Sequence, residues 1–333
     1  MNDKTIKWGV ISTANIGASK VVPAMQQCEL GKITAIGSAN VSRAKEIAQE
    51  HGIAKVHDSY DALLANPEID AVYIPLPNHL HVEWSIKALE AGKHVLCEKP
   101  IGLDTKDAQR LIDAAKKYPN LKVMEAFMYR FHPQWIKVKE LVADGAIGEV
   151  RTIHSIFTYF NDDPQNVRNQ SDIGGGGLMD IGCYNISFPR FVFEDEPEKI
   201  LGVIDRDPEL KTDRMTSGVM HFSGNRTSTF TCSTQLMPFQ RCIVHGREGL
   251  IEIQIPVNAP ADEPVQIFLR TKTGEEEYTF EPVDQYTLQA DAFAKAILNN
   301  TDVPTSLDDA LNNMKVIDAI VQSAENDAWV SIV

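Results

Sequence analysis

One lysine in this chain has the residue type and the placement to take part in chemistry. Lys99 lies in the run His94-Val-Leu-Cys-Glu-Lys-Pro100, where an apolar β-type segment ends in a turn. Ligands of open α/β sheets bind outside the carboxyl ends of the strands, so Lys99 would place an ammonium group at such an edge. Taken alone, Lys99 could also be an ordinary solvated lysine.

An aspartate and a tyrosine form the second chemical feature. Asp180 and Tyr184 follow the glycine run Gly174–Gly177 and are four residues apart on a predicted helix. Residues at this spacing share a helix face, and glycines let the backbone approach a ligand closely. A structural interpretation stays open for the pair, with a packed tyrosine ring and a carboxylate near a helix start.

The helices and strands that must position these residues follow one pattern in the first part of the chain and another in the second. Up to about residue 125, strands are expected at 6–11, 33–37, 71–74, 95–97 and 123–126, and helices up to 27 and at 42–51, 80–91 and 105–118. Strands that alternate with helices indicate βαβ units and a parallel, doubly wound sheet.

Strand-like runs dominate after about Gly148. Strands are expected at 150–159, 200–205, 219–222, 227–234, 242–245, 251–255, 265–272 and 278–280, and helices at 178–193, 285–298 and 307–324. Ser306 and Asp309 predict an N-cap for the last helix. The fold class is therefore α/β, with residues 1–125 as a domain built on a parallel sheet and 126–333 as a domain with an open, mostly antiparallel sheet.

The turn after the first strand resembles a dinucleotide-binding turn with two glycines replaced. It reads Ser12-Thr-Ala-Asn-Ile-Gly17, so Ser12 and Ala14 stand where the G-x-G-x-x-G fingerprint has its first two glycines. The following helix offers N–H groups to an anion. We expect a cofactor to be bound by Ser12, Thr13, Ala14, Asn15 and Ile16, and a turn without a ligand is the alternative.

The end of the second strand favours NADP over NAD. An NAD site usually has an Asp or Glu there for the ribose 2′-OH, but this chain has Gly37-Ser-Ala-Asn40 and then Arg43. Without an acid to repel a 2′-phosphate, Ser38 and Arg43 could bind one. Arg43 could also be a solvated helix residue.

Further polar residues follow other strands. Pro75, Asn78 and His81 are expected to line the nicotinamide half of the cofactor, although Asn78 could equally have a capping or loop role. Glu98 and Lys99 are also expected to bind the cofactor. Candidates for substrate contact are Arg130, His132, Tyr159 and Arg168. For Arg130 and His132, ion pairing between domains is the alternative.

Composition limits the partners. The chain has 333 residues and a net charge of −14, which predicts two domains and argues against a nucleic-acid or anionic-membrane partner. No run approaches the roughly 18 apolar residues of a membrane span, and the amino terminus lacks the apolar segment of a signal peptide. Five scattered cysteines without a CxxC pair and histidines without ligand spacing predict no metal site and reduced thiols in the cytoplasm.

Four segments together resemble the Gfo/Idh/MocA family of oxidoreductases, which is named after glucose–fructose oxidoreductase, inositol dehydrogenase and a rhizopine-catabolism protein. They are Trp8–Gly17, Ala88–Pro100, Glu125–Pro133 and Gly174–Tyr184. The residues of the last two segments are similar to those of one branch of the family, the dimeric dihydrodiol dehydrogenases and NADP-dependent D-xylose dehydrogenases. The resemblance extends over essentially the whole chain.

This resemblance implies a Rossmann domain and NAD(P)-dependent oxidation or reduction of a sugar, polyol or vicinal diol. Lys99 matches the catalytic lysine of the family, and Asp180 and Tyr184 match the ends of its Asp-x-x-x-His/Tyr motif. A tyrosine has an ordinary pKa of about 10, and a nearby ammonium group and a nicotinamide cation would lower it. We therefore expect Tyr184 to be the general acid/base, Lys99 to tune it and Asp180 to orient the site.

The resemblance also leaves rival interpretations. The family includes a sugar-pathway repressor, so the chain could be a dinucleotide-binding regulator without catalysis. It also includes glycosidases that hold NAD tightly. Family members pair through the open sheet of the second domain, which implies a homodimer or larger oligomer with 227–234 as a candidate surface. The family's serine-arginine pair after the second strand is Ser38-Ala39 here, so Arg43 would have to replace that arginine.

Overall fold

The computed structural model describes residues 5–332, which form two compact units. The first unit extends to Met128 and also contains Asp284–Leu311. The second unit contains Tyr129–Val283 and the described residues from Asn312 onward. Each unit has its own sheet, and the two are described separately.

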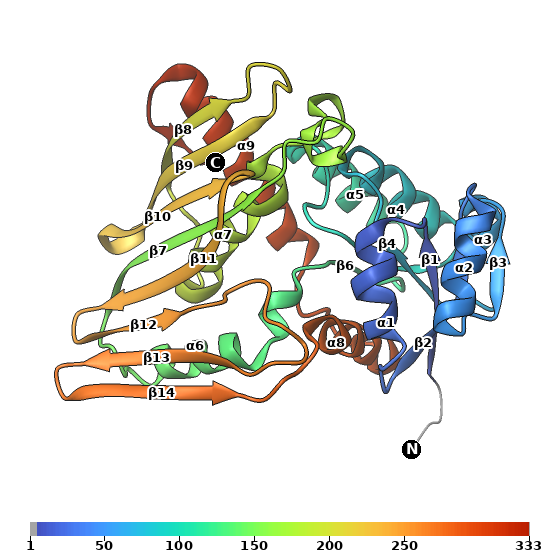
Figure 1. Cartoon of the computed structure of the whole chain (residues 1–333), viewed down its shortest axis with the longest axis horizontal. Coiled ribbons are helices and arrows are strands. Elements are labelled where there is room, and N and C mark those ends of the chain that lie inside the picture. Colours follow the sequence, from blue (N-terminus) through green and yellow to red (C-terminus); the bar gives the residue numbers. More distant parts are fainter. Residues whose placement is uncertain (1–4, 333) are drawn as a thin grey trace. The chain divides into compact units, whose positions relative to one another are not determined.

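The first unit is a parallel six-stranded sheet with helices packed on it (Figure 1). Its strand order is β3-β2-β1-β4-β5-β6, the order of a doubly wound dinucleotide-binding fold. The strands are β1 (Ile6–Ile11), β2 (Gly31–Gly37), β3 (Lys55–His57), β4 (Ala71–Ile74), β5 (His94–Cys97) and β6 (Val123–Glu125). The helices are α1 (Val22–Met25), α2 (Val41–His51), α3 (Tyr60–Leu64), α4 (His81–Glu90), α5 (Thr105–Ala115) and α8 (Gln285–Asn299).

Burial explains why β4, in the middle of this sheet, is apolar throughout. All four residues of β4 are buried, as expected for a parallel strand covered on both faces. Helix α8 belongs to this unit although it follows the second sheet in the chain, and it packs on α1 and β2. Its Phe293 ring lies 5.7 Å from that of the fully buried Trp8 in β1, measured between centroids.

The second unit is built on a nine-stranded sheet with the order β14-β13-β12-β11-β7-β10-β9-β8-β15. Its strands are β7 (Val150–Phe160), β8 (Lys199–Arg206), β9 (Asp213–Phe222), β10 (Arg226–Ser233), β11 (Gln235–Gly246), β12 (Gly249–Ile253), β13 (Val265–Thr271), β14 (Gly274–Phe280) and β15 (Val330–Ser331). Strands β7 and β10 pair in parallel, and the other pairs are antiparallel. The fold class expected from the sequence is confirmed.

Helices α6 (Pro133–Ala143) and α7 (Cys183–Phe193) pack on this sheet, with α9 (Leu307–Asn326) next to β8. An aromatic cluster fills the space under α6 and α7. The Trp135 ring stacks on Phe188 with centroids 4.8 Å apart, and Tyr129 meets Phe188 edge-on at 5.1 Å. Along β7, Ile153, Ser155 and Phe157 are buried while His154 is exposed, which is the alternation of a strand covered on one side.

Several elements differ from the expectation. The sequence did not predict β3, α3, α6 or β15, and β9 and β11 are longer than expected. The expected helix 178–193 begins with a π-helical turn, Leu178–Gly182, before α7. A π-helical turn also precedes α1, at Gly17–Val21.

The described residues add three observations on composition. All five cysteines are buried and free, which agrees with reduced thiols. Within 5–332, His, Cys, Asp and Glu side chains form no group of three that could hold a metal ion. No helix in that range is both long and apolar enough to cross a membrane.

Candidate active site

The turn after β1 keeps the geometry of a dinucleotide-binding turn although two glycines are replaced. Ser12 has φ of 94°, a backbone conformation that favours glycine. Its Oγ accepts a hydrogen bond from the Ala14 N–H at 3.1 Å. A Cβ on Gly17 would lie 3.1 Å from Cγ of Pro75, so this remaining glycine permits close packing between helix and strand. Helical backbone begins at Asn15, and the first N–H groups of a helix have no partner within it.

The end of β2 presents a serine and an arginine near the start of α2. Ser38 Oγ accepts from the Asn40 N–H at 3.1 Å, and the Asn40 side chain caps α2 by accepting from the Arg43 N–H at 3.1 Å. The Arg43 side chain is 45% exposed, and its guanidinium pairs with Glu46 at 2.9 Å. These residues and the turn after β1 are of the types, and follow the strands, that a dinucleotide site uses.

Lys99 follows β5 next to an anchored carboxylate. Glu98 accepts a hydrogen bond from the Tyr73 hydroxyl at 2.7 Å and one from the Lys99 N–H at 3.3 Å. Burial, and then the charge of Glu98, raises the pKa of Tyr73 well above its ordinary value, so Tyr73 is a neutral donor. The Glu98 contacts fix the backbone at the end of β5 from which Lys99 projects.

His81 is a buried residue at the same edge of the sheet. Its ring is 1% exposed and lies between two carbonyl groups, with Nε2 2.7 Å from Leu76 O and Nδ1 2.8 Å from Pro100 O. Burial lowers the pKa of His81 to about 4. A neutral ring donates through only one of its nitrogens, so one of these two carbonyls accepts a hydrogen bond and the other lies against the ring. The side chain is thus packed between the loop after β4 and the residue after Lys99, and its role in lining the cofactor stays a prediction. Asn78 begins the one-turn 3₁₀ helix of that loop.

In the second unit, Asp180 is the centre of a three-residue polar cluster. The Tyr159 hydroxyl donates to Asp180 Oδ2 at 2.7 Å, and Arg168 Nε lies 3.0 Å from Oδ1. Burial and then the charge of Asp180 raise the pKa of Tyr159. The sequence proposed Tyr159 and Arg168 as substrate contacts, and the structure brings both to the Asp180 carboxylate.

Tyr184 lies along the same face of β7 as Asp180. Its ring centroid is 6.2 Å from Phe157 and 6.0 Å from Tyr129, and the side chain is 4% exposed. Phe157 and Tyr159 are two residues apart on β7 and so point to the same side of the sheet. Asp180 and Tyr184 each contact one of them, which agrees with the shared face expected from their spacing.

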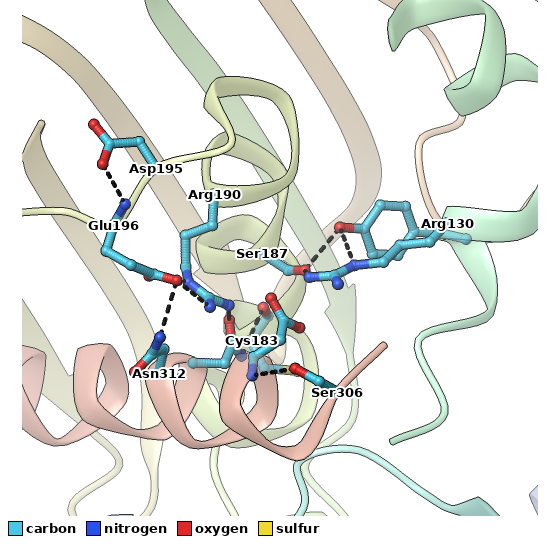
Figure 2. A network of polar contacts seen from close by, with 11 residues as sticks. Arg130, Cys183, Ser187, Arg190, Asp195, Glu196, Ser306 and Asn312 are labelled. Atoms are coloured by element: carbon cyan, nitrogen blue, oxygen red, sulfur yellow. Dashed lines mark hydrogen bonds and ion pairs between the residues drawn. The ribbon is translucent and has the colours of Figure 1, made fainter. Parts of the chain in front are cut away.

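Polar contacts of residues that include Cys183 and Arg190 hold α7 in place (Figure 2). Asn313 of α9 donates to the Cys183 carbonyl at 3.3 Å, and its Oδ1 accepts from the Arg190 guanidinium at 3.0 Å. Arg190 also forms a two-pronged ion pair with Glu196, at 2.6 and 2.8 Å. These contacts join the beginning and the end of α7 to α9, so the helix that carries Tyr184 is fixed at two points.

Arg130 and His132 have partners inside the second unit. Arg130 donates to Ser187 Oγ at 2.7 Å (Figure 2), and Ser187 Oγ lies 2.7 Å from the Tyr129 hydroxyl. His132 is 1% exposed and caps α6, with Nδ1 accepting from the Gln134 N–H at 3.2 Å. Burial lowers the pKa of His132 to about 4, so the ring is neutral.

The space beside the glycine run Gly174–Gly177 is occupied by the protein's own backbone and by a carboxylate. A Cβ on Gly175 would lie 2.7 Å from the Arg168 carbonyl oxygen, and one on Gly176 would lie 1.9 Å from Asp213 Oδ1. The sequence predicted that these glycines let the backbone approach a ligand closely. At Gly175 and Gly176 the groups that lie so close belong to the protein itself. Asp213 was not predicted, because it lies in a polar stretch with several other acids and no motif distinguishes it.

Comparisons with known proteins identify the family of the chain. A family model described as "oxidoreductase family, NAD-binding Rossmann fold" matches residues 6–127, and one described as "GFO/IDH/MocA C-terminal domain" matches 135–252. An uncharacterised oxidoreductase of Rhizobium meliloti is 43% identical, over 98% of this chain and 99% of its own length. A D-xylose 1-dehydrogenase (NADP⁺) of Haloferax volcanii is 34% identical, over 98% and 99%.

Two further relatives are described with other substrates or ligands. A trans-1,2-dihydrobenzene-1,2-diol dehydrogenase of Xenopus laevis is 32% identical over 74% of each chain. The crystal structure of a 3-ketoreductase from Actinomadura kijaniata, in complex with NADP and TDP-benzene, has a TM-score of 0.90 and 30% identity, over 96% of this chain and 98% of that one. The chain therefore belongs to the Gfo/Idh/MocA family of NAD(P)-binding oxidoreductases.

Proposed function

We propose that this protein is an NADP-dependent oxidoreductase that transfers a hydride between the nicotinamide and a sugar, polyol or vicinal diol. The first unit, which includes Asp284–Leu311 as well as the expected residues 1–125, would bind the cofactor, and the second unit would provide the substrate groups and a dimer surface. The observation that carries the proposal is the Asp180 cluster, in which Tyr159 and Arg168 hold a carboxylate one helical turn before Tyr184.

We assign the general acid/base role to Tyr184. Oxidation of an alcohol requires removal of its O–H proton while the hydride leaves the same carbon, and the nicotinamide ring accepts that hydride when it is bound. A tyrosine acts as a base near neutral pH only when its pKa is lowered. The Lys99 ammonium group would favour the phenolate and donate a hydrogen bond to the substrate oxygen.

Asp180 is best suited to an orienting role. Its two carboxylate oxygens already accept from the Tyr159 hydroxyl and face the Arg168 guanidinium. A carboxylate with a cation and a hydroxyl donor on it is stabilised in its charged form and is a poor proton acceptor. Asp180 would therefore hold Arg168 and the start of α7 in position while Tyr184 exchanges the proton.

The preference for NADP is supported by the residues after β2 and by the relatives. Gly37–Asn40 contains no carboxylate, and Arg43 lies in the first turn of α2. The D-xylose dehydrogenase and the 3-ketoreductase are both described with NADP. The relatives act on an aldose, a dihydrodiol and a deoxyketosugar nucleotide, which supports a polyhydroxylated or carbonyl substrate without identifying it.

Cofactor binding and turnover test the proposal directly. NADP⁺ should raise the unfolding temperature more than NAD⁺ does, and a panel of aldoses, inositols and diols should include a compound that generates absorbance at the reduced-nicotinamide band. Binding without an absorbance change for any compound in either direction would favour the non-catalytic regulator. A reaction without net reduction of free nicotinamide would favour the glycosidase-like chemistry.

We also propose a homodimer formed through the uncovered face of the nine-stranded sheet. That face has a hollow of about 460 Å³ lined by residues of β7 to β11, among them Ile156, Thr231 and Ile243. Val203 in β8 is 65% exposed and Met237 in β11 is 83% exposed. A monomer in light scattering at micromolar concentration would contradict this proposal.

A further inference from the structure

Asp213 is a buried carboxylate to which the proposed mechanism gives no task. It is the first residue of β9, and its side chain is 6% exposed. A carboxylate at this depth costs free energy unless hydrogen bonds compensate it. The groups that contact the Asp213 carboxylate therefore indicate its role.

The contacts of Asp213 converge on the backbone that precedes α7. Oδ2 accepts a hydrogen bond of 2.6 Å from the N–H of Leu178, the first residue of the π-helical turn, and one of 3.0 Å from the Thr216 hydroxyl. The Leu178 N–H is one of the donors that a helical turn cannot satisfy internally. A charged acceptor at this point forms a short, strong bond and fixes where the turn begins.

Gly176 is shaped to receive the same carboxylate. Its φ of 120° is unfavourable for residues with a side chain, and a Cβ there would lie 1.9 Å from Asp213 Oδ1. The Gly176 carbonyl accepts from the Asp180 N–H at 3.0 Å, and the Gly176 N–H donates to the Arg168 carbonyl at 2.7 Å. Asp213 therefore touches the residue that joins the Asp180 backbone to the Arg168 loop.

Burial and hydrogen bonding act in opposite directions on the charge of Asp213. Burial raises the pKa of Asp213 to about 6, against the opposing effects of the Leu178 and Thr216 hydrogen bonds and of the Arg206 cation. Tyr159 of β7 and Cys232 of β10 also sense its charge, and both are neutral because their own pKa values are raised. Asp213 is thus charged at neutral pH and lies next to the Asp180 cluster.

We propose that Asp213 is a positioning residue for the proposed hydride-transfer reaction. It holds the Leu178–Gly182 turn so that Asp180 and Tyr184 keep their positions against β7. This proposal rests on the proposed function for its catalytic consequence, but its structural part does not. Asp213 acts through the Leu178 N–H and the Gly176 backbone and touches neither substrate nor cofactor.

The test compares Asp213→Ala with Asp213→Asn, which keeps an oxygen acceptor for the Leu178 N–H. For Asp213→Ala we expect kcat to fall about a hundredfold, the scale of an ångström-sized misplacement of a reacting group. The Kd for NADP⁺ should stay within twofold of the parent value, since the turn after β1 is untouched. Asp213→Asn should restore kcat to within about threefold.

Amide hydrogen exchange gives a readout that does not need turnover. In Asp213→Ala the amides of Leu178–Tyr184 should exchange at least tenfold faster, while those of β10 and β7 stay protected. A second variant, Gly176→Ala, should reproduce both effects by displacing the carboxylate. Unchanged exchange at 178–184, or a kcat within twofold of the parent, would overturn the proposal, as would faster exchange throughout the sheet.

The two proposals fail in different ways. If no compound of the panel is turned over by the parent protein, the proposed function fails, and exchange at Leu178–Tyr184 still decides whether Asp213 holds the turn. If the parent is active and Asp213→Ala keeps its kcat, the proposed function stands and the role of Asp213 fails.

Discussion

The Ser12 hydroxyl accepts the hydrogen bond of the Ala14 N–H, at 3.1 Å, in the turn where a dinucleotide pyrophosphate would need backbone donors. Ser12 stands where the fingerprint has its first glycine and keeps a glycine-like φ of 94°. The serine therefore has two effects on the turn, because it strains the backbone and occupies a donor that a ligand could use.

Replacing Ser12 by glycine should improve both properties. Ser12→Gly relieves the positive φ, which should raise the free energy of unfolding by about 1 kcal/mol, and it releases the Ala14 N–H, which should tighten NADP⁺ binding several-fold. The control is Ser12→Ala, which releases the N–H but keeps the strain, so it should tighten binding without the gain in stability. Chemical denaturation and nicotinamide fluorescence measure the two quantities. Weaker binding in both variants would mean that the hydroxyl itself contacts the cofactor.

Glu46 should lower the preference for NADP. It pairs with Arg43 at 2.9 Å on the exposed face of α2, so a 2′-phosphate has to compete with it. Exposed ion pairs contribute about 0.2–1 kcal/mol, and Glu46→Gln should therefore lower the Kd for NADP⁺ by up to about fivefold and leave that for NAD⁺ unchanged. Glu50→Gln, at an exposed glutamate of the same helix, should change neither.

Arg43→Ala supplies the reverse comparison for this site. Loss of the guanidinium should weaken NADP⁺ binding and spare NAD⁺. Equal Kd values for NADP⁺ in the variant and the parent would exclude Arg43 as the 2′-phosphate ligand.

The sequence predicted the sheets better than the contacts made by their polar side chains. Lys99 and Asp180 carry motifs that identify them, and the apolar runs of β1 and β4 define a parallel sheet. Helix α6 was missed, although Pro133 stands at its first turn, because its buried residues Trp135, Val138 and Leu141 form only a narrow stripe.

The unpredicted parts of the site depend on long-range contacts. His81 was predicted to line the cofactor because it follows β4, and the sequence gives no sign that its ring also lies against the Pro100 carbonyl, 19 residues away. Asp213 is 35 residues from Leu178, and nothing local to either residue indicates that they meet. The single-sequence pattern shows which side chains are polar, and only the packed fold shows what each of them bonds.

Replacing Tyr184 by phenylalanine distinguishes the role of Tyr184 from that of Tyr159. Tyr184→Phe should lower kcat at least about a hundredfold, the scale of acid–base assistance, while binding NADP⁺ as the parent does. Tyr159→Phe removes one donor from Asp180 and leaves Arg168 in place, so its kcat should fall by a smaller factor. Steady-state kinetics over pH 6–10 compare the two, and a Tyr184→Phe variant with near-parental kcat would exclude the acid/base role.

Asp213 should make the protein less stable as the pH rises through weakly acidic values. Its folded pKa of about 6 lies above the unfolded value of 3.8, so the folded state holds the proton longer and stability falls between these two pH values. The loss amounts to about 3 kcal/mol at neutral pH. Asp213→Asn should therefore be more stable than the parent at pH 7.5 and lose this advantage at pH 4. Urea denaturation at the two pH values measures it, and equal differences at both would contradict the pKa.

His132 should act in the opposite direction. Burial lowers its pKa to about 4 in the folded protein, whereas an unfolded histidine titrates near 6.5, so the unfolded chain takes up the proton first on acidification. The associated stability is complete above pH 6.5 and is lost, by up to about 3 kcal/mol, as the pH falls to 4. The geometry supplies the cause, because Nδ1 accepts from the Gln134 N–H and cannot do so once protonated.

His132→Asn tests this effect, because asparagine is a good N-cap that does not titrate in this range. The variant should lose less stability than the parent between pH 6.5 and 4.5 in urea denaturation, and the difference between the two should grow with acidity. His245→Asn, at an exposed histidine of β11, serves as the matched control and should follow the parent. A His132→Asn curve parallel to that of the parent would mean that folding does not lower the pKa of His132.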